Sequence, residues 1–358
     1  MTSSTVVHHR PVTYQDVSPL DWFQLRSFLW EGLADWSTDH PQRWSQIAQQ
    51  VNRACPDSAP RSPEVFHGIY QRLTEAMPEV REVATKPGLG IRLWTRILYN
   101  SAQALFGAPP VFMNLGFVGL GDGAPGAPDL QPEDEPFRLN IQLYECLIGG
   151  SDLTGKDVLE VGCGTGGGCS YMHRYRAPAT VTGIDLVDDN IRACEALHGS
   201  EGMTFLQGDA LSLPVPSDSF DALVNLESSG CYPSMDSFLA EVRRVLRPGG
   251  EFLFADLRPT AEEWGPDRTL DGLRHQLADS GLEVLQERNI TANVLASIDL
   301  QEEARQGALE ALGVVGADRL HFDEIMLCHG SHNYRKLKTG ELQYWNFTCR
   351  SPASEEVP

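Results

Sequence analysis

The sequence has few basic residues for its length. Its 358 residues include 28 Lys and Arg against 49 Asp and Glu, so the formal net charge is -21 at pH 7. A surface that binds duplex nucleic acid needs clustered Lys and Arg to displace counterions from the phosphates, and an anionic membrane attracts the same residues. The composition therefore argues against nucleic acid and against an anionic membrane surface as partners.

Long apolar runs and paired cysteines are also absent from the sequence. No uncharged apolar stretch approaches the roughly 18 residues of a membrane span, and the first residues, MTSSTVVHHRPVTYQ, lack an apolar segment behind a basic start. The eight cysteines show no CxxC spacing, which favours reduced thiols over a disulfide framework or a zinc site. We therefore expect a cytoplasmic protein without a membrane span.

The length of the chain allows two or three units with their own cores. Residues 1–110 are predicted to form a helical N-terminal unit, because apolar residues recur at intervals of three and four in LDWFQLRSFLWEGLADW and GIRLWTRILYNSAQALF. Residues 111–150 form a connecting segment, and the abundance of Gly, Pro and acidic residues at 119–136 predicts a flexible loop there. Residues 151–358 form the remaining unit.

Short β-rich runs alternate with helical patterns from residue 155 onward. The β-rich runs include DVLEVG, TVTGID, MTFLQGD, FDALVNLES, GEFLFADL and LEVLQERNIT. Such alternation builds βαβ units and predicts a doubly wound α/β fold, with a parallel sheet covered on both faces. Residues 292–338 are predicted as a helical insertion before a final strand, ELQYWNFTCR.

The stretch VLEVGCGTGGG, residues 158–168, places five glycines within seven positions directly after a short apolar run. A strand that ends in such a turn and opens a helix presents backbone N–H groups and the positive helix end to a ligand, with no Cβ in the way. The pattern fits the dinucleotide fingerprint Gly162-x-Gly164-x-x-Gly167. It fits equally well as Gly162-x-Gly164-x-Gly166 with the acidic Glu160 two residues before it.

The residues after the glycine turn separate two classes of cofactor. Asp185 ends the second predicted strand, where a carboxylate accepts hydrogen bonds from the ribose diol of NAD or of S-adenosylmethionine. QGDALSLPVPSDSFDALV then places Asp209 just past the third strand, and RVLRPGG precedes the fifth. With these motifs at these spacings, residues 157–259 resemble the class I S-adenosylmethionine-dependent methyltransferases. The Asp209 motif and the RPGG turn disfavour a nicotinamide oxidoreductase.

This resemblance implies S-adenosyl-L-methionine as the cofactor and a Rossmann-like sheet of seven strands whose last strand is antiparallel. It implies that the glycine turn lies under the methionine part of the cofactor, that Asp185 holds the ribose hydroxyls, and that Asp209 and Ala210 meet the adenine. It also implies that the residues after strand four face the sulfonium and the substrate. Residues 111–150 then become a cofactor-covering segment, because the resembling enzymes have a comparable F-x-N-x-G-(aromatic) stretch before the core. The predicted cofactor-binding residues are Asn114, Phe117, Glu160, Gly162, Cys163, Gly164, Gly166, Asp185, Leu186, Asp209, Ala210, Asn225 and Leu226.

A finer resemblance covers residues 111–347. LEVGCGTGGGCSYM, NLESSGCYP, FLAEVRRVLRPGGEFLFADLRP and GELQYWNF are similar to the methyltransferases that O-methylate phthiotriolone lipids in mycobacteria, and to their relatives in bacterial secondary metabolism. NLESSGCYP is also similar, more distantly, to sterol and tocopherol C-methyltransferases. The resemblance implies methyl transfer to an oxygen of a hydrophobic small molecule. C-methylation of an alkene or other activated carbon is the alternative.

The catalytic base does not follow directly from the resemblance. A hydroxyl acceptor is helped by a base within hydrogen-bond reach, and the phthiotriolone-type enzymes usually carry His where this chain has Gly230. Histidines three residues apart can also bind a metal, but Gly330 and Ser331 between them favour a loop, and we predict no metal site. The predicted catalytic residues are Glu227, Tyr232, His329 and His332.

A third alternative is a cofactor-binding protein without catalytic activity. It is motivated by Gly230 and by the N-terminal helices, which lie outside the resemblance. Those helices would then bind a partner protein or form a homo-oligomer.

Overall fold

The computed structural model describes residues 62–76, 110–120, 128–261, 265–311 and 322–353, together with positions 44–46, 48–49, 92 and 95. The chain divides into two compact units, one of Met1–Ala108 with Glu310–Phe322 and one of Pro109–Leu309 with Asp323–Pro358. Most of the predicted N-terminal helices and residues 121–127 of the predicted flexible loop lie outside the described residues. In the first unit, helix α3 (Pro63–Ala76) buries Phe66 and Tyr70.

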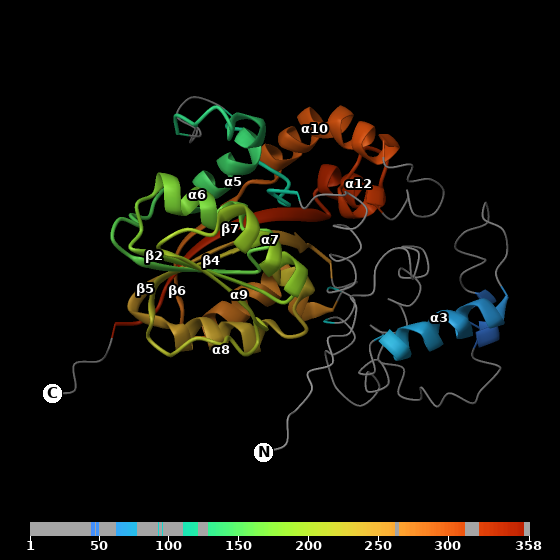
Figure 1. Ribbon diagram of the computed structural model, residues 1–358, viewed down its shortest axis with the longest axis horizontal. Coiled ribbons are helices and arrows are strands. Elements are labelled where there is room, and N and C mark those ends of the chain that lie inside the picture. Colours follow the sequence, from blue (N-terminus) through green and yellow to red (C-terminus); the bar gives the residue numbers. More distant parts are fainter. Residues whose placement is uncertain are drawn as a thin grey trace, which may run out of the picture. The chain divides into compact units, whose positions relative to one another are not determined.

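A seven-stranded sheet organises the second unit (Figure 1). The strands are β1 (Asp157–Val161), β2 (Thr180–Asp185), β3 (Met203–Gln207), β4 (Phe220–Leu226), β5 (Leu246–Pro259), β6 (Glu283–Asn289) and β7 (Leu342–Arg350). They lie in the order β3-β2-β1-β4-β5-β7-β6. β1 to β5 pair in parallel, whereas β7 is antiparallel to both β5 and β6. This confirms the predicted α/β class, including the antiparallel last strand.

Helices cover both faces of the sheet and bury a separate apolar core on each (Figure 1). The helices on one face are α5 (Arg138–Ile148), α6 (Gly167–Tyr175), α7 (Asp188–His198) and α10 (Thr291–Ala311), and those on the other are α8 (Met235–Val245) and α9 (Leu270–Asp279). The central strands therefore have no solvent-facing side. Val158, Leu159 and Leu223 are fully buried, which explains why these strands are near-continuous apolar runs.

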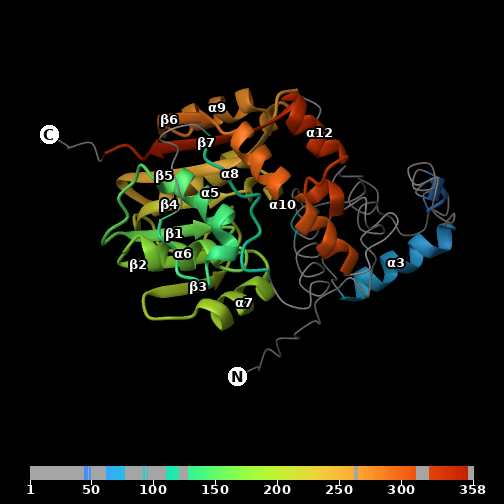
Figure 2. The same ribbon diagram turned by 90° about the horizontal axis from the view of Figure 1, so that it is seen from above.

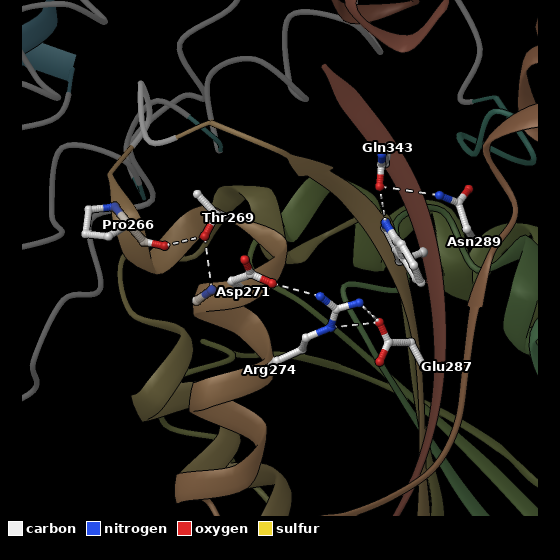
Figure 3. Close-up of polar contacts among 9 residues, drawn as sticks. Pro266, Thr269, Asp271, Arg274, Glu287, Asn289 and Gln343 are labelled. Atoms are coloured by element: carbon white, nitrogen blue, oxygen red, sulfur yellow. Dashed lines mark hydrogen bonds and ion pairs between the residues drawn. The ribbon is translucent and has the colours of Figure 1, made fainter. Parts of the chain in front are cut away.

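Polar contacts fasten α9 to the strands at the β6 edge of the sheet (Figure 3). The guanidinium of Arg274 on α9 donates to Glu287 of β6, with Nε 2.9 Å from Oε1. It also lies over the ring of Trp345, 5.3 Å from its centroid. Gln343 accepts hydrogen bonds from the Trp345 indole at 2.9 Å and from Asn289 of β6 at 3.3 Å. These contacts hold β6 and β7 together as the last pair of strands.

Two helices, α10 and α12 (His332–Thr339), overlap the residues predicted as a helical insertion and extend one residue beyond them at each end. Ser331 caps α12 by accepting the backbone N–H of Tyr334 at 3.1 Å. β7 then follows after Gly340, whose φ of 83° ends the helix. In the ranges that the structure describes, no helix is both long enough and apolar enough to cross a membrane.

Candidate active site

The glycine turn follows β1 at the edge of the sheet where the parallel strands β2, β3 and β4 also end. Gly162, Gly164 and Gly166 have φ angles of 72°, 54° and 85°, which L side chains rarely adopt. A Cβ on Gly162 would lie 2.4 Å from the Ser228 Oγ, and one on Gly164 would lie 2.3 Å from the Met113 Cε. The turn therefore needs glycine for its backbone, and Gly162 also needs it for the close approach of Ser228.

Asp185, at the end of β2, ties the turn to the loop before α7. One carboxylate oxygen accepts the Gly164 N–H at 2.9 Å, and the other accepts the Val187 N–H at 2.9 Å and the Asn190 amide at 3.1 Å. Burial raises the pKa of Asp185 to about 6, although these hydrogen bonds act in the opposite direction. Asp185 lies at the end of the second parallel strand, where a carboxylate holds the ribose diol in nucleoside-binding sheets.

Glu160 and Cys163 support the turn from the protein interior. Glu160 of β1 accepts hydrogen bonds from the Tyr144 hydroxyl at 2.7 Å and from the Cys169 thiol at 2.9 Å, and burial raises its pKa to about 7. Cys163 is buried, and the thiol of Cys194 donates to the Gly164 carbonyl at 3.2 Å. The predicted contacts of Glu160 and Cys163 with the cofactor stay predictions.

The residues predicted to meet the ribose and adenine follow β2 and β3 at the same edge. The Leu186 carbonyl accepts the Gln207 side-chain amide at 3.2 Å, which ties the ends of these two strands together. Asp209 turns the chain after β3, because its carboxylate accepts the Leu211 N–H at 3.0 Å. Ala210 is buried under this turn.

A segment that precedes α5 lies against the glycine turn, and we call residues 110–118 the strap. The Thr165 hydroxyl in the turn donates to the Pro110 carbonyl. A Cβ on Gly167 would lie 2.2 Å from the Val111 carbonyl oxygen, and Met113 meets Gly164 as described above. The first residues of the strap are therefore in contact with the predicted cofactor turn.

Asn114 and Phe117, the strap residues predicted to bind cofactor, have structural partners. Asn114 accepts the N–H of Gly116 at 2.9 Å, and its carbonyl accepts the side-chain amide of Asn140 on α5 at 2.7 Å. Phe117 is 3% exposed and belongs to the apolar core between α5, α6 and α10. Their contact with the cofactor stays a prediction.

The end of β4 carries a polar cluster around Asn225. The Asn225 amide nitrogen donates to the Val161 carbonyl at 2.9 Å, and to the Ser228 and Tyr232 hydroxyls at 2.8 Å each. Its Oδ1 atom is buried and lacks a hydrogen-bond partner within the described part of the chain. Tyr232 is held by this cluster, and burial raises the pKa of its phenol. Leu226, the last residue of β4, is buried in the core.

Glu227 follows β4 with a φ of 51°, which is rare for a residue other than glycine. Its carboxylate accepts the Leu115 N–H of the strap through both oxygens, at 3.1 and 3.2 Å, and the Tyr344 hydroxyl at 2.7 Å. Burial raises the pKa of Glu227 to about 7, and the two hydrogen bonds oppose it. A strained residue whose carboxyl titrates near neutrality, at the edge where ligands bind, is a candidate for proton transfer.

His329 and His332 lie at the surface, the first just before α12 and the second at its first position. The His329 ring hydrogen-bonds to Asp299 of α10 at 2.8 Å and packs on Tyr334, with ring centroids 4.6 Å apart. His332 begins α12, and its backbone N–H donates to Glu324 at 2.6 Å. The described contacts do not join either histidine to Glu227. No group of three potential metal-ligating side chains occurs among the residues with described positions.

Tyr344 and Arg305 are site residues that the sequence interpretation missed. Tyr344 of β7 is fully buried and donates to Glu227, and Arg305 of α10 lies close enough to Glu227 to lower its pKa. The run ELQYWNF predicts that Tyr344 lies in a strand. It does not predict that the side chain reaches Glu227 at the end of β4. Arg305 could have been found from the sequence, because it belongs to a series of polar residues spaced four apart on α10.

These strand-end residues have the features of a site for a nucleoside cofactor. Three glycines lead from β1 into α6, a buried carboxylate ends β2, and the Asn225 Oδ1 atom at the end of β4 has no hydrogen-bond partner among the described residues. The arrangement fits S-adenosylmethionine. The fold and the site together define a class I S-adenosylmethionine-dependent methyltransferase.

Comparison with known proteins gives the family. Residues 159–254 match the family model described as a methyltransferase domain. The chain is 44% identical over 202 residues to a fatty-acid O-methyltransferase of Mycolicibacterium smegmatis, covering 56% of this chain and 69% of that protein. It is 40% identical over 222 residues to the phthiotriol/phenolphthiotriol dimycocerosates methyltransferase of Mycobacterium leprae, covering 62% and 78%. The chain therefore belongs to this family of methyltransferases, and its cofactor is S-adenosylmethionine.

A solved structure shares the fold at low identity. Geranyl diphosphate C-methyltransferase from Streptomyces coelicolor is 17% identical and has a TM-score of 0.54, with 74% of this chain and 99% of that chain covered. At this identity the likeness establishes the common fold.

Proposed function

We propose that this enzyme transfers the methyl group of S-adenosylmethionine to an oxygen of a hydrophobic small molecule, of lipid or secondary-metabolite type. Two relatives support this proposal, because one is named for fatty acids and the other for phthiotriol lipids. The observation that carries it is Glu227, a carboxyl group with a pKa of about 7 at the end of β4. Such a group is suited to accept the proton of an acceptor hydroxyl.

We propose that the cofactor is held by the residues that end the first four strands. The Gly162–Gly166 turn would lie under its methionine part, Asp185 would accept from the ribose hydroxyls, and Asp209 with Ala210 would border the adenine. Residues 111–150 would cover it, starting with the strap residues that already contact the turn. The buried oxygen of Asn225 offers an acceptor for a donor group of the cofactor.

S-adenosylmethionine supplies a methyl group on a sulfonium, and its transfer is an in-line displacement. The protein must therefore align the acceptor, exclude water and remove one proton from a hydroxyl. Glu227 is held for the last task, because the Leu115 N–H and the Tyr344 hydroxyl fix the orientation of its carboxylate. Tyr232, His329 and His332 remain candidates, but the Tyr232 hydroxyl is engaged by Asn225 and Ser228, and the histidines are exposed.

C-methylation of an alkene or another activated carbon is the second candidate function. It is favoured by the same carboxylate and by its neighbour Tyr344, because carbon transfer through a cation would use a carboxylate and aromatic rings rather than an exposed histidine. The two candidates differ in the atom that receives the methyl group, so the product distinguishes them.

Transfer of a carbon-13 methyl group tests the proposal. The purified protein is incubated with S-adenosylmethionine labelled in its methyl group, a panel of long-chain fatty acids and hydroxylated lipids, and an extract of the source organism. A labelled methoxy or methyl ester carbon in the product, located by NMR, is the expected result. A label on a carbon of the acceptor would instead support C-methylation and contradict O-methylation.

A further inference from the structure

The peptide group of Leu115 in the strap is held from both sides. Its N–H donates to the Glu227 carboxylate, as described above. Its carbonyl oxygen accepts hydrogen bonds from three side chains of α10, at 3.0 Å from Ser297 Oγ, 3.1 Å from Gln301 Nε2 and 3.4 Å from Arg305 Nη2. A carbonyl oxygen has two lone pairs, so three donors more than satisfy it. A single backbone oxygen of the strap therefore accepts hydrogen bonds from three side chains of the same helix.

The donors on α10 belong to a regular stripe. Asn293, Ser297, Gln301 and Arg305 follow one another at intervals of four residues, which places them on one face of the helix. Asn293 extends the contact to the far end of the strap, because its side-chain amide donates to the Val118 carbonyl at 2.8 Å and its carbonyl accepts the Val118 N–H at 3.2 Å. The stripe therefore binds strap backbone along three turns of α10. Figure 2 shows the ribbon of α10 in the second unit.

The strap is shaped to meet this stripe. Gly116 has a φ of 77°, and a Cβ there would lie 2.5 Å from Ser297 Oγ and 3.0 Å from Gln301 Nε2. A side chain at this position would therefore strain the backbone and crowd the two donors on α10. The opposite end of the strap touches the glycine turn, through Pro110, Val111 and Met113. One continuous segment thus joins the stripe on α10 to the cofactor turn.

We propose that the side chains of Asn293, Ser297, Gln301 and Arg305 are positioning residues that hold the strap closed over S-adenosylmethionine. Their contacts with the strap stabilise the closed form alone, so they slow the release of the cofactor and of its demethylated product. The proposal rests on the glycine turn being the cofactor site, but it does not depend on which atom is methylated. By reciprocity, bound cofactor must in turn tighten the contact between the strap and α10.

The experiment compares full-length variants in binding of S-adenosylhomocysteine, the demethylated cofactor. Gln301→Leu keeps the size of the side chain and removes its donor, and Ser297→Ala removes the buried hydroxyl. Glu303→Gln is the matched control, because Glu303 is exposed on the same helix. We expect Gln301→Leu to weaken binding in calorimetry by about tenfold, as expected for a loss of one to two backbone hydrogen bonds. The control should bind like the parent chain.

Hydrogen exchange of the amides at residues 111–118 supplies a readout that a purely structural role would not change. In the parent chain, S-adenosylhomocysteine should slow exchange in the strap, and in Gln301→Leu this protection should be lost while exchange in β1 and β4 is unchanged. If Gln301→Leu and Ser297→Ala bind as tightly as the parent chain and keep the protection, the stripe does not hold the strap. Gly116→Ala disturbs the same contact from the strap side, so it can be measured in place of an α10 variant that does not fold. Failure of the O-methylation proposal would show in the labelled product and leave these binding results unaffected.

Discussion

The hydrogen bonds on the cofactor side of the site join residues that are close in sequence. Those on the side that faces α10 join residues that are far apart in sequence. Gly164 and Asp185, which meet at the cofactor turn, are 21 residues apart. Glu227 is 112 residues from Leu115 and 117 from Tyr344, and Leu115 is 182 residues from Ser297. The first side is a local strand–turn–helix motif that recurs between proteins. The second is assembled by contacts between segments far apart in the sequence, which local patterns do not reveal, so the class of reaction is easier to assign than the acceptor.

The largest expected effect lies on the cofactor side. Gly162→Ala combines a positive φ with a Cβ 2.4 Å from Ser228, whereas Gly281→Ala has a similar φ of 74° and open space around it. Backbone strain of about 1–3 kcal/mol is common to both, and the close contact is added only at Gly162. We expect Gly162→Ala to weaken S-adenosylhomocysteine binding at least about 100-fold in calorimetry. Gly281→Ala should lower the unfolding temperature slightly and leave binding unchanged. Equal binding by the two variants would show that the turn tolerates a side chain.

The second largest effect tests the proton acceptor. Glu227→Gln keeps an oxygen for the Leu115 N–H but cannot take up a proton at neutral pH. We expect methyl transfer to fall by about 100-fold or more, the usual contribution of a positioned base, with little change in cofactor affinity. A loss of affinity with an unchanged rate of transfer would instead assign Glu227 to holding the strap alone.

The difference in sequence separation between the two sides of the site also explains how much could be predicted from the sequence. The six β-rich runs, the final strand and the doubly wound class follow from local periodicity and glycine spacing, and β1 to β7 confirm them. The four-residue spacing of Asn293, Ser297, Gln301 and Arg305 is visible in the sequence, but it does not say what the stripe contacts. That depends on where the strap crosses α10, which is set by packing between elements more than 100 residues apart.

The pH dependence of transfer sharpens the assignment of Glu227. A base must be ionised, so with a pKa of about 7 the value of kcat/KM should rise with pH through 7 and level off above it. The Tyr344 hydroxyl lowers the pKa of Glu227 by donating to its carboxylate. Tyr344→Phe should therefore move the rise to higher pH and reduce activity at pH 7 by roughly threefold. A hydrogen bond of about 1 kcal/mol changes the ionisation constant about fivefold, which lowers the ionised fraction at pH 7 from about one half to about one sixth. A profile that does not move in Tyr344→Phe would mean that another group sets it.

The smallest effect is expected from the exposed histidines on α12 and before it. His329→Gln removes a surface contact with Asp299, and His332→Gln changes the exposed first residue of α12. Because no contact among the described residues joins either ring to the Glu227 cluster, we expect each substitution to change the rate of methyl transfer by about twofold or less, as for most surface changes. The rate is measured under the conditions used for Glu227→Gln. A loss comparable to that of Glu227→Gln would move the base from the end of β4 to the α10–α12 region. The long-range contacts of Glu227 would then serve only to hold the strap.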